Sequence, residues 1–140
     1  MSQRGSRQRT LPARPGDTDP CPCGGGEYGS CCGRAHHGTW AANTAEALMR
    51  SRYSAFAVGD REYLARTWHP DTRPARVEVD PGTEWTGLEI LGTEGGTPFH
   101  GEGTVRFRAR YREGGRAGEM VEHSRFVRVD GAWVYLDARA

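Results

Sequence analysis

Four cysteines crowded into one short stretch constrain this chain more than any other feature of its sequence. They form two close pairs, Cys21 with Cys23 and Cys31 with Cys32, separated by a glycine-rich spacer. Zinc prefers four ligands in a tetrahedron, with thiolates about 2.3 Å from the ion. The glycines allow the backbone to turn sharply around an ion, where a Cβ would clash. We therefore predict a structural zinc knuckle, with Zn²⁺ bound by Cys21, Cys23, Cys31 and Cys32.

The ligand set has alternatives, because two histidines follow the second cysteine pair. His36 or His37 could replace Cys32 as the fourth ligand, and four unligated, redox-active thiols would need no metal. Clustered cysteines in a reducing compartment indicate metal binding more than disulfides. Four protein ligands leave no open position for water, so we expect the ion to be structural and not catalytic.

Composition limits the classes of partner that the chain can have. The 140 residues carry 19 basic and 18 acidic side chains, a net charge of +1. This balance does not favour a nucleic-acid or membrane partner. No apolar run reaches the roughly 20 residues that a membrane helix needs. Residues 1–20 are too polar for a signal peptide, so we expect a cytoplasmic protein.

The first 20 residues predict a disordered basic tail. The segment has no acidic residue before Asp17, and Leu11 is its only large aliphatic residue after Met1. Such a segment cannot bury enough apolar surface to offset the entropy that ordering removes. A nucleic-acid-binding arm is the alternative interpretation. Its basic residues are Arg4, Arg7, Arg9 and Arg14.

Two helices are expected after the cysteines. Asn43 with Glu46 resembles a capping box, and apolar residues then recur at spacings of three and four. This pattern predicts a helix over residues 43–58. Asp60 can cap a second, shorter helix. The buried side of that helix would hold Tyr63, Leu64 and Trp68.

Beyond Pro74 the apolar period changes to two, which is typical of strands. Asp130-Gly131 stands between two apolar runs, the strongest short hairpin signal, and Gly114-Gly115 supplies another turn. Helices followed by an antiparallel meander predict an α+β fold, with the helices on one face of a curved sheet. The expected strands are residues 76–79, 84–91, 104–112, 120–129 and 133–137.

The cysteine stretch resembles a SEC-C motif, the zinc-binding knuckle found at the C-terminus of SecA and in many small bacterial proteins. That motif usually reads Cys-Pro-Cys-Gly-Ser-Gly, then polar residues with an aromatic, then Cys-Cys or Cys-His. Here Gly25 replaces the serine, Tyr28 is the aromatic, and the spacer is one residue shorter than usual. The resemblance implies a bound zinc and a surface that contacts another protein.

The segments that follow resemble the YchJ family of uncharacterised bacterial proteins. The long signature runs from Thr44 to Phe56, and Ser124-Arg125-Phe126 matches near the C-terminus, whereas Val121 stands where a histidine is expected. The resemblance implies a nuclear-transport-factor-like, or cystatin-like, cone in which helices pack into a strongly bent antiparallel sheet. The expected units are a tail (residues 1–20), a zinc knuckle (residues 21–38) and an α+β cone domain (residues 39–140).

Polar residues on the last strands are candidates for a pocket inside such a cone. Glu122 and Arg125 are three apart on a predicted strand, so one should face the helices and the other should face away. An interior charge is costly unless it is paired, so we expect a closed structural ion pair with Arg73, His69 or Asp137. The candidate pocket residues are His69, Glu122, Ser124, Arg125 and Asp137.

Three functions fit the sequence. The expected one is a zinc-containing binding or adaptor protein that contacts another protein through its knuckle. An enzyme would need an acid or base in a pocket of the cone, next to a small-molecule ligand. RNA or ribosome binding would use the alternating arginines of residues 106–112 and the basic tail. One polar face of a sheet is normal, however, so nucleic acid is the least favoured partner.

Overall fold

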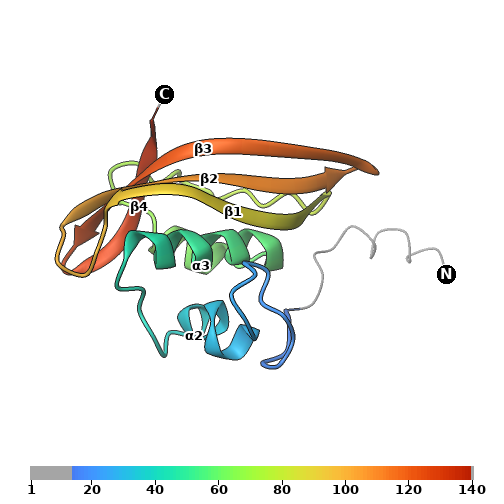
Figure 1. Ribbon diagram of the computed structural model, residues 1–140, viewed down its shortest axis with the longest axis horizontal. Helices are drawn as coiled ribbons and strands as arrows, with labels where there is room; N and C mark the ends of the chain where they lie inside the picture. The colour runs from blue at the N-terminus through green and yellow to red at the C-terminus, as the bar shows by residue number, and fades with distance from the viewer. Residues whose placement is uncertain (1–13, 140) are drawn as a thin grey trace.

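A four-stranded antiparallel sheet, in the order β1-β2-β3-β4, forms one layer of the fold. Register shifts interrupt β1 twice, between Trp85 and Gly87 and between Ile90 and Gly92. Such bulges bend a strand and increase its twist, so the sheet is curved (Figure 1). In the computed structural model, which describes residues 14–139, the strands are β1 (Thr83–Gly95), β2 (Glu102–Glu113), β3 (Arg116–Val129) and β4 (Ala132–Arg139).

Tight turns join the last three strands as their sequences predict. Asp130 and Gly131 have φ of 52° and 84°, and Gly114 and Gly115 have φ of 56° and 82°. Two successive residues with positive φ suit the right-handed twist of a hairpin. Both hairpin predictions are confirmed, and they place β3 between β2 and β4.

Helix α3 (Ala45–Val58) packs against β1, β2 and β4 and forms the second layer (Figure 1). Its N-cap lies one residue later than expected, because the Thr44 hydroxyl, and not Asn43, accepts a hydrogen bond from the Ala47 amide at 3.0 Å. The shorter helix α4 (Arg61–Arg66) follows, and Asp60 caps it as predicted by accepting from the Tyr63 amide.

The main core lies between α3 and β2. Val105, Phe107 and Ala109 alternate along β2 and are buried against Leu48 and Met49 of α3. The alternation predicted for this strand is therefore confirmed, and so is the α+β fold. No helix in residues 14–139 is both long enough and apolar enough to cross a membrane.

The expected strand over residues 76–79 is absent from the structure. This segment has irregular backbone, although Val77 and Val79 are buried. Their side chains pack in a second apolar cluster with Tyr63 and Leu64 of α4. The alternating valines therefore reflect burial against a helix, because no neighbouring strand offers this segment hydrogen bonds.

The knuckle forms a third layer on the side of α3 that faces away from the sheet (Figure 1). It contains the short helices η1 (Tyr28–Ser30) and α2 (Cys32–His36). Residues 1–13 of the predicted tail lie outside the described residues. Residues 14–20, which the same prediction includes, make defined contacts: Arg14 forms an ion pair with Asp60 at 3.0 Å, and the Tyr28 amide donates to the Asp19 carbonyl at 2.8 Å.

Candidate functional site

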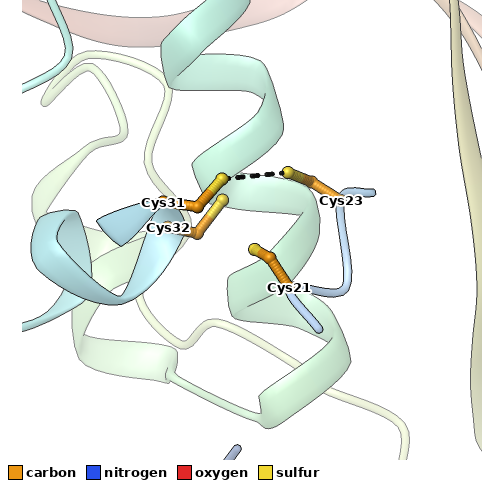
Figure 2. Close-up of side chains that lie close together, drawn as sticks. All are labelled: Cys21, Cys23, Cys31 and Cys32. Atoms are coloured by element: carbon orange, nitrogen blue, oxygen red, sulfur yellow. Dashed lines mark hydrogen bonds between the residues drawn. The ribbon is translucent and has the colours of Figure 1, made fainter. Parts of the chain in front are cut away.

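The four cysteine sulfurs converge on one point beside α3. Cys21 and Cys23 come from the loop before η1, and Cys31 and Cys32 come from the start of α2 (Figure 2). The four Sγ atoms lie within 4.8 Å of one another, and those of Cys23 and Cys31 are 3.5 Å apart. A tetrahedron of thiolates around zinc has sulfur–sulfur separations of about 3.8 Å. The cluster therefore has the dimensions of a tetrathiolate metal centre.

The loop around the cluster closes because glycines occupy its tightest positions. Gly24 and Gly26 have φ of 84° and 125°, which L side chains rarely adopt. The Cys21 amide donates to the Gly26 carbonyl at 2.7 Å and so completes the turn. A Cβ on Gly25 would lie 3.0 Å from the Cys31 sulfur. Glycine in place of the usual serine therefore lets the shorter spacer close around the sulfurs.

The thiols differ in acidity because they share hydrogen bonds in a buried place. Hydrogen bonds from Cys23 and Cys32 hold the pKa of Cys21 far below its usual range. Burial raises the pKa of Cys31 to about 12. A divalent cation would remove this asymmetry, because metal binding displaces the protons from all its thiolate ligands. The donor set, four sulfurs with no oxygen, suits zinc.

His36, one of the alternative ligands, has a different role in the structure. Its Nδ1 is 2.6 Å from the Tyr28 hydroxyl, and its Nε2 is 2.9 Å from the Ser51 carbonyl oxygen. Both ring nitrogens are occupied, so His36 links the knuckle to α3 and is not available to a metal. Cys32 belongs to the sulfur group, whereas neither His36 nor His37 does.

Helix α3 separates the sulfur cluster from the interior of the cone domain. On its knuckle side, the Ser54 hydroxyl lies 3.6 Å from the Cys21 sulfur, and Cys32 donates to the Arg50 carbonyl at 3.4 Å. The Arg50 guanidinium in turn donates to the Cys23 carbonyl at 3.2 Å. The same helix lines a cavity on its opposite side.

The cavity has a volume of about 300 Å³ and lies between α3 and the sheet. Its walls are mainly aromatic and aliphatic, as expected for a site that takes a small organic ligand. The Tyr53 hydroxyl is buried without a hydrogen-bond partner among the described residues. The apolar and aromatic lining consists of Met49, Tyr53, Phe56, Trp68, Trp85, Phe107, Ala109, Met120 and Tyr135.

Charged and polar groups also line this cavity. Arg52 of α3 is 3% exposed, and its guanidinium lies over the rings of Trp68 and Tyr135 at 5.0 and 4.9 Å. Burial lowers the pKa of Arg52 to about 10, so the side chain is still protonated at neutral pH. Glu122 of β3 accepts hydrogen bonds from the hydroxyls of Ser124, at 2.6 Å, and Tyr135, at 3.3 Å.

Only two of the five candidate pocket residues line the cavity, namely Glu122 and Ser124. Arg125 lies outside it and forms a bidentate ion pair with Asp137, with both contacts at 2.6 Å. His69 caps a turn by accepting from the Asp71 amide. The expected closed ion pair for the interior charge is also wrong. Within residues 14–139, Glu122 has no cationic atom within 4.0 Å and borders open space.

Arg52 and Tyr135 line the cavity but are not among the pocket residues predicted from the sequence. Arg52 stands in the same helical stripe as Met49, Tyr53 and Phe56, at spacings of three and four. A lone arginine in an otherwise apolar stripe is the signal that could have identified it, because an unpaired buried charge is costly. Its position on α3, and not on the last strands, explains the omission.

The two central arginines of the β2 row, Arg108 and Arg110, are paired with neighbouring acids. Arg108 lies 2.9 Å from Glu89 and 3.3 Å from Glu119, and Arg110 lies 3.7 Å from the same two carboxylates. Charge paired across three strands is less available to phosphate groups. The centre of the row therefore belongs to a cross-strand ion-pair network.

Comparisons with known proteins agree with this architecture. Residues 44–138 match the family described as YchJ, middle NTF2-like domain. A UPF0225 protein of Streptomyces coelicolor is 65% identical over 121 residues, which cover 86% of this chain and 94% of that protein. A UPF0225 protein of Corynebacterium glutamicum is 54% identical over 116 residues, 82% of this chain and 92% of that protein.

Two solved structures have a similar fold over most of this chain. The solution structure of a SEC-C motif containing protein from Rhodopseudomonas palustris has a TM-score of 0.76 at 34% identity, covering 87% of this chain and 98% of that one. The crystal structure of a sec-c motif containing protein from Psychrobacter arcticus has a TM-score of 0.67 at 26% identity, covering 89% and 80%. Fold and cysteine cluster thus define a SEC-C-type knuckle joined to an NTF2-like domain. The chain belongs to the YchJ family.

Proposed function

We propose that this protein binds a small organic molecule in the cavity of its cone domain, and that a structural zinc in the knuckle secures the helix that forms one wall. The observation that carries the proposal is the cavity of about 300 Å³, enclosed mainly by aromatic and aliphatic side chains with Arg52 and Glu122 among them. Well-packed cores rarely leave a void of this size, whereas binding sites require one.

The proposed zinc is supported by four converging sulfurs, of which three belong to cysteines that are buried. Four protein thiolates complete the tetrahedron, so the ion would hold the knuckle together and would not activate water. Its effect would reach the cavity through α3, because Ser54 and the backbone at Arg50 contact the cysteines directly.

Recognition of another protein by the knuckle remains a separate prediction. Residues 24–27 at the tip of the cysteine loop are exposed, and a partner would find them accessible. Nothing in the geometry singles out such a partner, whereas the cavity has a defined volume and lining. Ligand binding is therefore the function that the described residues support best.

A substitution that fills the cavity tests the proposal. Ala109 is buried in β2 and lines the cavity. In Ala109→Phe, the ring should enter the open space, leave the melting temperature near that of the wild type, and abolish binding of small aromatic fragments. Saturation-transfer NMR with a fragment library measures the binding, and thermal denaturation measures the stability.

Ala55 offers a matched control, because it is fully buried in the second apolar cluster and does not line the cavity. Ala55→Phe should destabilise the protein by about 1–3 kcal/mol or more, as overpacking usually does. Equal destabilisation by both substitutions would show that the cavity is not open in solution. A screen in which no fragment loses binding in Ala109→Phe would overturn the proposed function.

A further inference from the structure

Arg52 brings a positive charge into the cavity wall without an acidic partner. Its Nη1 donates to the Leu64 carbonyl at 2.9 Å and to the Thr67 hydroxyl at 2.7 Å. Within residues 14–139, its Nε and Nη2 make no hydrogen bond, and no carboxylate oxygen lies within 4.0 Å of the guanidinium. A guanidinium has five N–H donors, and the Nε and Nη2 groups together match the two oxygens of a carboxylate.

Glu122 lines the same cavity and carries the opposite charge, also without a charged partner among the described residues. The hydroxyls of Ser124 and Tyr135 both donate to its Oε2, whereas Oε1 accepts no hydrogen bond from the described residues. A carboxylate can accept about four hydrogen bonds, so half of this group is unused. Arg52 and Glu122 thus line one cavity with opposite charges, yet they do not form an ion pair with each other.

We infer that the cavity binds a small zwitterion with an apolar body, whose carboxylate pairs with Arg52 and whose ammonium group pairs with Glu122. An α-amino acid with an apolar or aromatic side chain is the simplest molecule of this class. The inference rests on the proposed function, because it assigns the ligand class of the same cavity. A simple acid would meet Glu122 as a like charge, and a simple amine would meet Arg52 in the same way.

The remaining walls suit the apolar body of such a ligand. Trp68 and Trp85 present aromatic rings, and the flexible thioether of Met120 can adapt to an irregular shape. A volume of about 300 Å³ equals roughly ten water molecules, which matches a molecule of amino-acid size. The burial of Arg52 and the partial burial of Glu122 strengthen their attraction to the ligand, because the surrounding medium screens them less than water does.

Three probes that differ by one charge at a time test the inference. They are phenylalanine, its neutral-carboxyl derivative phenylalaninamide, and its neutral-amine derivative N-acetylphenylalanine. Isothermal titration with wild-type protein should show phenylalanine binding about tenfold more tightly than either derivative, as expected when a charged hydrogen bond is replaced by a neutral one. Ala109→Phe should abolish binding of phenylalanine.

Two variants assign each charge to its residue. Arg52→Met should remove the preference for phenylalanine over phenylalaninamide, and Glu122→Gln should remove the preference over N-acetylphenylalanine. Arg125→Met is the matched control, because it makes the same substitution at an arginine outside the cavity and should retain both preferences. Arg52→Met also loses contacts to α4, so Arg52→Lys, which keeps the charge, provides a second variant that should retain partial preference.

The relative affinities of the three probes for the wild-type protein test the inference even if an Arg52 variant does not fold. Equal or tighter binding of either derivative would overturn the zwitterion, as would absence of phenylalanine binding. Fragments that still bind in the cavity would then leave the proposed function standing. A screen without any fragment sensitive to Ala109→Phe would instead remove both proposals together.

Discussion

Helix α3 contacts two regions, one on each of its sides, and these regions differ in the side chains that they bury. On one side the knuckle encloses four sulfurs with glycine-rich loops and short helices, and it contacts the Ser51 carbonyl and the Ser54 hydroxyl of α3. On the other side the cone domain packs α3 against apolar side chains of a curved sheet and leaves a cavity. The knuckle is small and its cysteines form no disulfide, so we expect its order to depend on a bound metal and on contacts to α3. The cone domain buries apolar side chains between α3 and the sheet, so we expect it to stay folded when the metal is removed.

Metal removal should separate the two regions most clearly. The purified protein should contain about one zinc per chain, as four thiolates bind one ion. A chelator should then abolish hydrogen-exchange protection in residues 21–38, because structural zinc supplies about 10–16 kcal/mol of apparent binding energy in small zinc-finger peptides. The strands of the cone domain should keep their protection. Hydrogen exchange with and without chelator measures both.

Cys32→Ser gives the same test without a chelator, because it removes one sulfur from the group. Its exchange pattern should match that of the chelated wild type. Metal content near zero with four titratable thiols would contradict the zinc centre. Unfolding of the whole chain on chelation would show that the knuckle and the cone domain form one cooperative unit, and the comparison between them would fail.

His36 links the knuckle to α3, and loss of this link should reduce stability less than loss of the metal does. His36→Phe preserves a buried ring but removes the contacts of His36 to the Tyr28 hydroxyl and the Ser51 carbonyl, and leaves Tyr28 only its longer contact from Arg14 at 3.4 Å. A buried polar group left without a hydrogen bond costs about 1–3 kcal/mol. We expect chemical denaturation to show a loss in this range. A loss confined to knuckle exchange, with the cone domain unchanged, would show that the link stabilises one side only.

The pH dependence of the protein's stability gives a second test of the role of His36. Burial lowers the pKa of His36 in the folded protein below its usual value of about 6.5. The unfolded chain therefore takes up a proton first, and the stability associated with neutral His36 is lost as pH falls below about 6.5 towards the folded pKa. Acid also protonates the thiolates in both proteins. The wild type should hence lose more stability than His36→Phe over this window, and parallel pH profiles would contradict the assignment.

The smallest effect is expected on the outer face of the sheet. Arg125 pairs with Asp137 at 2.6 Å, but both side chains are exposed, and solvent screens such pairs strongly. Arg125→Met should melt at nearly the same temperature as the wild type. Arg52→Met, the same substitution inside the cavity, should lower the melting temperature clearly, because it removes contacts to Leu64 and Thr67. If Arg52→Met and Arg125→Met melted at the same temperature, the contacts of buried Arg52 would add nothing to stability.

Several local features of the fold were predictable because neighbouring residues decide them. The Asp130-Gly131 turn follows from the positive φ that both positions need, and the buried side of β2 follows from strict alternation. Other local predictions failed where two arrangements fit the same local pattern. Thr44 and Asn43 can both cap α3, and only the path of the chain before the helix selects Thr44. Val77 and Val79 alternate like strand residues but pack beneath a helix.

The sequence by itself determined the cysteine cluster, the order of α3, α4 and the four strands of the sheet, and the rule that Glu122 and Arg125 face opposite ways. These depend on spacing along the chain, which is visible in any sequence. Only the tertiary structure decided that Glu122 faces inward, that Arg52 from a distant helix lines the same cavity, and that the cavity stays open. Such facts depend on how bulged strands curve around α3, because the curvature sets which side chains meet and whether they fill the space between them.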